Sequence, residues 1–409
     1  MDLSDSKPTR RRFLKAGIVL GATLAPSAGR AQPTPDDPAK VLGGPIRPYG
    51  ERSRFEQATR SRFARSKTDE VAASTLTPLD ETHGIITPSS LHFEVHRGGV
   101  PDIDPAKHRL LIHGMVDRPV VLTIEEIRAL PSTSRIVFVE CQGNTQLEWR
   151  APTGKTVADT HGATSCCEWT GVPLSLLLRE VGVQRGAGWV LAEGGDGSGN
   201  ERSVPLTKAT DDVIVAYGQN GEAIRPENGY PLRLVVPGWS GNMNVKWLRR
   251  LKLVDRAYRT RMDDVGQPIL LSDGTARHLN FFLEAKSVIT SPSGGHQLRR
   301  RGRYEIRGLA WSGHGRVRRV EVSTDRGKTW RDATLQAPIL PCAHTRFLID
   351  WRWDGQEAVL QSRCTDETGY VQPTREALVK VRGLNSRFFN NSIQSWRVAT
   401  DGTVSNVHA

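Results

Sequence analysis

The last third of the sequence consists of short apolar segments separated by turns, which restricts this part of the chain to an all-β fold. Tyr304–Ala310 and Val317–Ser323 come first, and a turn at Asp325–Lys328 follows them. Ala343–Trp353 and Ala358–Asp366 continue the series. About seven short strands in some 95 residues, punctuated by glycine and aspartate, are typical of an immunoglobulin-like sandwich.

The middle of the chain has a different pattern, in which strands alternate with few, short helices. Such a mixture predicts an α+β domain from about residue 81 to residue 255. The expected helices are Leu122–Leu130, with Thr123 as its N-cap, and Pro173–Glu180. The expected strands are Arg109–Gly114, Ser134–Cys141, Gly188–Ala192, Asp212–Tyr217, Leu232–Pro237 and Lys246–Val254.

Four further segments complete the predicted organisation. Residues 1–31 form a signal peptide and residues 32–80 an extension rich in Pro, Arg, Ser and Thr that wraps a core. Residues 256–283 lack clear periodicity and form a linker before the β domain at 284–383. The polar tail, residues 384–409, is expected to pack along a neighbouring surface.

The N-terminus carries the features of a twin-arginine export signal. Arg10 and Arg11 precede a short, mildly apolar run that ends in small residues at Ala31. Such signals export folded proteins, which predicts a periplasmic enzyme loaded with its prosthetic group in the cytoplasm. Export is expected to depend on Arg10 and Arg11. A generic basic tail is the alternative interpretation.

Charge and cysteine content restrict the class of partner. The net charge of +12 falls to +8 without residues 1–31, which hold six Lys/Arg and two Asp (12 − 4). The arginines are scattered among acidic residues without a nucleic-acid-binding motif, so an anionic substrate or acidic partner is favoured. The sequence lacks an apolar run of about 20 residues. Five cysteines in an oxidising compartment leave at least one outside any intramolecular pair.

Cys141 is the candidate for an unpaired cysteine that binds a metal. It stands at the end of a strand and is followed by Gly143 and Asn144, so backbone N–H groups are expected to converge on its sulfur. A thiolate of this kind binds a soft metal. Taken alone, the motif favours a buried structural cysteine over a metal ligand.

Other conspicuous residues have simpler interpretations. His92 and His96 have metal-ligand spacing but lie in an irregular segment, which argues against a zinc pair. Adjacent Cys166 and Cys167 are expected in the core or behind the site, because adjacent cysteines pair only with strain. Arg299–Arg301 is expected to be a solvated edge of the sandwich, with docking of an acidic redox partner as the alternative.

An ordered series of motifs around Cys141 resembles the sulfite oxidase family of molybdenum enzymes, over roughly residues 85 to 380. Within that family the sequence is most similar to the molybdenum subunits of sulfane dehydrogenases, in Gly84–Ser89, Gly154–Val157, Thr164–Leu174 and Asn390–Trp396. The family motifs are Phe93–Arg97, Val100–Pro105, Val139–Asn144, Glu193–Asp196, Ser203–Leu206, Gly229–Gly238, Asn244–Leu248 and, in the β domain, Ala310–Gly313.

The resemblance implies molybdenum bound as molybdopterin, with Cys141 as the protein ligand to the metal. It implies catalytic roles for Cys141, Arg97 and His96. Arg233 and Lys246 are suited to neutralise a cofactor phosphate, and Asp196 to accept from a pterin N–H. The implied cofactor contacts are Phe93, Glu94, Val95, His96, Arg97, Cys141, Asp196, Asn228, Arg233, Asn244, Val245 and Lys246.

Three positions depart from the family pattern. Val95 aligns with an arginine beside the metal, and Gln267 aligns with a tyrosine of the substrate pocket. Asn228 stands where animal sulfite oxidases carry histidine. Arg97 is expected to take over the role of the missing arginine. The departures motivate an alternative reading as a cofactor-binding, catalytically weak structural or assembly subunit.

The implied reaction is a two-electron oxidation at sulfur. The expected substrate is sulfane sulfur on a carrier protein of the thiosulfate-oxidising system, and direct oxidation of free sulfite is the alternative. The sequence holds no haem, flavin or iron–sulfur motif, so a separate c-type (dihaem) cytochrome subunit is expected to take the electrons. A homodimer or heterotetramer that assembles through the β domain is the expected state.

Overall fold

The computed structural model describes residues 44–63, 73–260, 269–270, 273–277, 281–384 and 386–409. The proposed signal at residues 1–31 and Gln267 lie outside these ranges. Residues 57–409 form one unit, separate from the preceding residues, and hold all the described helices and strands. Among the described residues, no helix combines the length and apolar character needed to cross a membrane.

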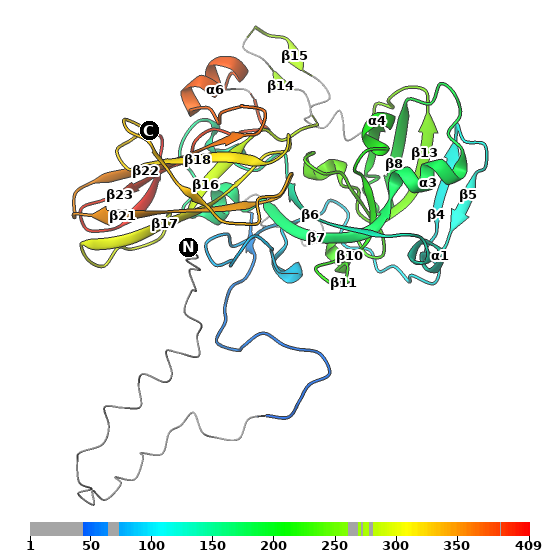
Figure 1. The fold of residues 1–409 in the computed structure, drawn as a ribbon, viewed down its shortest axis with the longest axis horizontal. Helices are drawn as coiled ribbons and strands as arrows, with labels where there is room; N and C mark the ends of the chain where they lie inside the picture. The colour runs from blue at the N-terminus through cyan, green and yellow to red at the C-terminus, as the bar shows by residue number, and fades with distance from the viewer. Residues whose placement is uncertain (1–43, 64–72, 261–268, 271–272, 278–280, 385) are drawn as a thin grey trace, which may run out of the picture. The chain divides into compact units, whose positions relative to one another are not determined.

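The first domain contains two five-stranded sheets around a large apolar core (Figure 1). The first sheet has the order β5-β4-β13-β8-β9. The second has the order β11-β10-β7-β6, with β12 also paired to β10. The strands are β4 (Leu110–Gly114), β5 (Val120–Leu122), β6 (Thr133–Glu140), β7 (Thr164–Pro173), β8 (Trp189–Gly194), β9 (Glu201–Pro205), β10 (Ile214–Gln219), β11 (Glu222–Ala223), β12 (Arg233–Val235) and β13 (Leu248–Val254).

Short helices connect these strands. Thr123 caps the first of them as expected, because its hydroxyl accepts from the Glu126 N–H and the Glu126 carboxylate accepts from the Thr123 N–H. The helices are α1 (Ile124–Ala129), α2 (Val157–His161), α3 (Leu174–Val181) and α4 (Leu206–Ala209), with 3₁₀ turns at Ser89–Leu91, Gln146–Trp149, Pro226–Asn228 and Gly241–Met243.

The extension takes part in the first domain through a small sheet. β1 (Ser61–Arg62) pairs with β2 (Ser74–Leu76), which pairs with β3 (Glu94–Val95). The extension is thus hydrogen-bonded to the Phe93–Arg97 segment. In the expected linker the structure describes a hairpin of β14 (Ile269–Leu270) and β15 (Ala276–Arg277).

The second domain is a two-layer β-sandwich, as the strand pattern predicts (Figure 1). One sheet has the order β16-β17-β21-β20 and the other β19-β18-β22-β23-β24. The strands are β16 (Lys286–Ser291), β17 (Gly302–Trp311), β18 (Val317–Ser323), β19 (Arg331–Asp332), β20 (Thr334–Leu335), β21 (Thr345–Trp353), β22 (Ala358–Asp366), β23 (Ser395–Val398) and β24 (Val404–Val407).

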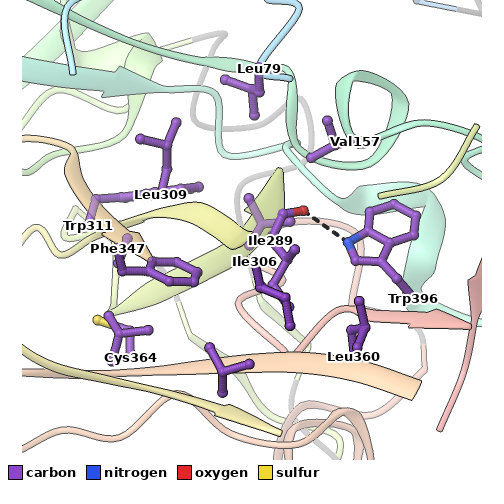
Figure 2. Packing of buried hydrophobic residues seen from close by; sticks show 14 of the residues in the cluster. Leu79, Val157, Ile289, Ile306, Leu309, Trp311, Phe347, Leu360, Cys364 and Trp396 are labelled. Atoms are coloured by element: carbon purple, nitrogen blue, oxygen red, sulfur yellow. Dashed lines mark hydrogen bonds between the residues drawn. The ribbon is translucent and has the colours of Figure 1, made fainter. Parts of the chain in front are cut away.

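Two predictions about the C-terminal part of the chain were wrong. Residues 395–407 do not lie along a neighbouring surface but add β23 and β24 to the sandwich. Trp396 of β23 is fully buried in the sandwich core, where its indole N–H donates to the Ile289 carbonyl at 3.0 Å (Figure 2). The region expected to be all-β also contains the helix α6 (Arg375–Arg382), which is capped by Thr374.

Candidate active site

The Cys141 thiol lies in a tight loop at the point where β6 ends. The strand stops at Glu140, one residue earlier than expected, so Cys141 begins the loop. The Gly143 N–H points at Cys141 Sγ across 3.4 Å, and the Asn144 N–H donates to the Cys141 carbonyl at 2.8 Å. Burial raises the pKa of the Cys141 thiol, while the Gly143 N–H and the Arg97 charge act in the opposite direction. Among the described residues, one backbone N–H, that of Gly143, reaches the sulfur, so the predicted convergence of several N–H groups on Sγ is not found.

Cys141 opens into a cavity of about 430 Å³, within the usual size range of cofactor sites. Ten of the twelve predicted cofactor contacts line this cavity, although they come from segments far apart in the chain. They are Phe93, Val95, His96, Arg97, Cys141, Asp196, Asn228, Arg233, Asn244 and Lys246.

The two remaining predicted contacts do not line the cavity. Val245 is completely buried in the core of the first domain. The Glu94 carboxylate lies behind His96, with Oε2 2.6 Å from His96 Nε2, and it also forms an ion pair with Arg60 of the extension. His96 Nδ1 in turn lies 3.0 Å from Lys246 Nζ. Glu94 therefore holds a residue that lines the cavity instead of facing it.

His96 is neutral in this arrangement. Burial, followed by the charge of Lys246, lowers the pKa of His96 to about 3. If Nε2 donates to Glu94, Nδ1 is left as the acceptor for the Lys246 ammonium. The Lys246 ammonium also donates to the Val95 and Glu227 carbonyls, so its direction is fixed. His96 is better suited to orient Lys246 than to transfer a proton near neutral pH.

Arg233 supplies a positive charge to the cavity wall, whereas burial and the charge of Arg233 lower the pKa of Lys246 well below its usual range. Its side chain is 4% exposed and lies over the Trp169 ring, with the guanidinium carbon 4.9 Å from the ring centre. One guanidinium N–H₂ group donates to the Asn228 carbonyl at 2.8 Å. Burial lowers the pKa of Arg233 to about 10, so it stays charged near neutral pH. Among the described residues, neither Arg233 nor Lys246 forms an ion pair with a carboxylate.

The donor set of the cavity fits an anionic, hydrogen-bonding cofactor. Arg233 Nε, Asn228 Oδ1 and His92 Nε2 are buried polar atoms without a partner among the described residues, and all three residues line the cavity. An unpaired buried polar atom is costly, which indicates that a bound group satisfies it. A phosphate suits Arg233 and Lys246, whereas pterin N–H and ring nitrogen atoms suit the amide oxygen and the imidazole. Cys141 exposes a sulfur atom to the same cavity, the soft type of ligand that the implied metal would need.

The cavity also contains residues that the sequence analysis missed. Arg387 and Phe388, from the expected polar tail, line its wall, and the Arg387 guanidinium carbon lies 5.1 Å from the centre of the Phe388 ring. Phe63 and Thr75 of the extension line it as well. The tail is fixed at this place, because the Phe389 N–H donates to the Gln142 carbonyl and the Asn390 amide donates to the Thr145 carbonyl. No periodicity marks these residues; the only signal was a basic-aromatic cluster in a polar segment.

Val95, which departs from the expected family pattern, and Arg97, its expected replacement, both lie at the cavity. Val95 lines the cavity and is 38% exposed, so an apolar side chain stands where the resemblance implies an arginine. Arg97 is exposed, lines the same cavity and acts electrostatically on Cys141. This geometry is compatible with the expected replacement of the missing arginine by Arg97.

The other conspicuous residues have the following surroundings. The described residues contain no group of three or more His, Cys, Asp or Glu side chains arranged to hold a metal. His92 is buried against Phe93 and Trp169. Cys166 and Cys167 are free, fully buried thiols that belong to two different apolar clusters. Arg299–Arg301 is exposed to solvent.

Comparisons with known proteins agree with this geometry. Residues 97–262 match the oxidoreductase molybdopterin binding domain, and residues 277–396 match the Mo-co oxidoreductase dimerisation domain. The crystal structure of the sulfane dehydrogenase SoxCD from Paracoccus pantotrophus is similar with a TM-score of 0.89 and 43% identity, covering 95% of this chain and 100% of that one.

Plant and algal relatives are more distant. The NADH nitrate reductase of Ulva prolifera is 35% identical over 60% of this chain and 32% of its own length. That of Solanum lycopersicum is 33% identical over 72% of this chain and 37% of its own. This chain thus spans about a third of the length of these reductases.

Proposed function

Because this chain belongs to the sulfite oxidase family of molybdopterin oxidoreductases, we propose that it oxidises sulfane sulfur as the molybdenum subunit of a sulfane dehydrogenase. Its cofactor is molybdenum bound as molybdopterin. The observation that carries the proposal is the likeness to SoxCD, with 43% identity over 95% of this chain.

The cavity residues have separate tasks in this proposal. Cys141 Sγ ligates the metal, and Arg233 with Lys246 holds the cofactor phosphate at the buried end. Glu94 and His96 orient the Lys246 ammonium. When bound, the molybdenum centre supplies two-electron oxidation of sulfur, with oxygen from water. The protein itself binds, orients and balances charge.

The substrate we propose is sulfane sulfur carried on a cysteine of a carrier protein in thiosulfate oxidation. The cavity is lined by the exposed cations Arg97 and Arg387 together with the apolar side chains of Val95 and Phe388. Cations favour the anionic sulfur at the end of the substrate, and apolar groups favour the chain that carries it. Free sulfite has the charge but not the apolar part.

Purified protein should contain about one molybdenum per chain and should turn over a carrier-bound persulfide faster than free sulfite. Metal analysis, pterin fluorescence after oxidative release and both assays on one preparation check this. Faster oxidation of free sulfite would make the chain a direct sulfite dehydrogenase. Full metal loading with negligible turnover of either substrate would favour the catalytically weak subunit, as Val95 suggests.

Arg387→Met should raise KM for the sulfur substrate by about tenfold and leave kcat nearly unchanged, because an exposed guanidinium at the cavity wall binds the substrate anion without touching the metal. Steady-state kinetics across substrate concentration checks this. Arg299→Met is the matched control, since Arg299 is also exposed but lies in the sandwich and does not line the cavity. An unchanged KM in Arg387→Met would exclude the residue from substrate binding.

The proposed partners are a c-type dihaem cytochrome subunit, which accepts the electrons, and the sulfur-carrier protein. The similarity to the two-component SoxCD structure supports a partner subunit. The match to a dimerisation domain at residues 277–396 supports a homodimer or heterotetramer built through the sandwich. We further propose that the protein works in the periplasm after twin-arginine export, on the basis of Arg10 and Arg11 in the sequence.

A further inference from the structure

The residue before the proposed metal ligand is a buried carboxylate held by the second domain. Glu140 is 2% exposed, and its Oε1 lies 2.8 Å from Lys286 Nζ. The Trp311 indole N–H donates to Oε2 at 2.7 Å. Lys286 in β16 and Trp311 in β17 are directly opposite each other in the sandwich, so one cross-strand pair holds the carboxylate.

The same carboxylate also fixes the loop that carries Cys141. The Asn144 amide donates to Glu140 Oε1 at 2.9 Å, and Asn144 Oδ1 accepts from the Ala163 N–H at 3.1 Å. The Cys141 N–H donates to the Ala163 carbonyl at 2.9 Å. Glu140 therefore holds the loop on both sides of Cys141, because it is the preceding residue in the chain and its carboxylate binds the Asn144 amide three residues further on.

Stability alone does not account for a buried ion pair at this place. Apolar residues of similar volume often stabilise a fold as well as a buried pair does, because the pair costs desolvation. A single buried carboxylate next to a metal-bound sulfur would disfavour negative charge on that sulfur. With Lys286 as its counter-ion, Glu140 is able to make strong, directional hydrogen bonds without adding net charge to the site.

We propose that Glu140, held by Lys286 and Trp311, is a positioning residue through which the sandwich domain fixes the orientation of the Cys141 sulfur at the metal. This inference rests on the proposed role of Cys141 as metal ligand. If Glu140 has this role, the sandwich domain helps to position the metal ligand in addition to its proposed role in subunit assembly.

The test uses the full chain loaded with its cofactor and a charge-neutral double variant, Glu140→Gln/Lys286→Met. Removing both charges leaves no uncompensated ion, so the variant should fold with a Tm within a few degrees of the parent. Its Mo(V) electron paramagnetic resonance spectrum should change, because the g-values depend on how the thiolate sulfur is oriented at the metal. We expect kcat to fall about tenfold with KM unchanged.

The matched control is Glu321→Gln/Arg363→Met, which removes a partly buried ion pair (Nε–Oε2, 2.7 Å) within the sandwich and away from the cavity. It should leave the spectrum and kcat as in the parent. A Glu140→Gln/Lys286→Met protein that has the parent's spectrum and kcat would overturn the proposal.

If the double variant does not accumulate as folded protein, Trp311→Phe tests the positioning role of Glu140 instead. It removes one hydrogen bond to Glu140, keeps the aromatic packing and changes no charge. A shifted spectrum supports the proposal, and the parent spectrum refutes it. Failure of the underlying ligand assignment is recognised separately: Cys141→Ser would then keep the parent's metal content and spectrum.

Discussion

Cys141→Ser should lower turnover more than about a hundredfold while the Tm and the pterin content stay close to those of the parent. Serine has nearly the same size, so the loop keeps its packing, and Sγ receives one hydrogen bond, from the Gly143 N–H. A hydroxyl is a harder and far less acidic ligand than a thiol, which changes the metal's electronic structure and potential. Turnover, bound molybdenum, pterin and the melting curve should be measured on one preparation.

Cys342→Ser is the control for this variant. Cys342 is also a partly buried free thiol, but it does not line the cavity. Its replacement should leave turnover and metal content unchanged. If Cys141→Ser shows full activity and normal metal content, Cys141 is only a structural thiol. Inactivity with a collapsed melting curve would reflect misfolding, so the assignment requires inactivity with the fold and the pterin retained.

Arg233→Met is expected to have opposite effects on cofactor binding and on the stability of the cofactor-free protein. The variant removes a buried cation that has no carboxylate partner among the described residues, so cofactor affinity should fall by about a hundredfold. Without cofactor the same cation costs desolvation, and the Tm of the apo-protein should stay equal or rise by a few degrees. Pterin released per chain and the apo Tm measure the two effects.

Arg202→Met provides the comparison, since Arg202 is 1% exposed in the same domain but does not line the cavity. Its replacement should lower the Tm and leave pterin content normal in the protein that folds. Normal pterin content in Arg233→Met would show that Arg233 does not hold the cofactor phosphate.

The alternation of apolar residues and the turn residues were sufficient to predict the strands of the sandwich, but not all the strands of the first domain. β18 and β22 have the bounds expected from the sequence, because each is a regular strand with turn residues at its ends. β7, the longest strand of the first domain, was missed. Most of its residues are buried on both faces of the sheet, which removes the alternation that marks a strand.

The lining residues that belong to short family motifs could be predicted from the sequence. Those that reach the cavity only through the folding of distant segments could not. Cys141, Arg233 and Lys246 were recognised because each stands in a segment typical of the family. Val245 stands between the lining residues Asn244 and Lys246 and points the other way, as alternate side chains of an extended segment do. Glu94 does not follow this rule: its carboxylate contacts the His96 ring instead of the cavity. Arg387 and Phe388 reach it from the other domain, through contacts that no local pattern encodes.

The contribution of Arg387 and Phe388 to the cavity has a consequence for the order of biogenesis. The cavity wall is completed by residues just before β23, near the end of the chain, and their backbone is tied to Gln142 and Thr145. During synthesis the first domain emerges without this wall, so a cofactor that bound before synthesis ended would enter an open site. The cavity wall is complete only after β23 and β24 have joined the sandwich. A ribosome-bound or C-terminally truncated chain would therefore expose the cavity to solvent.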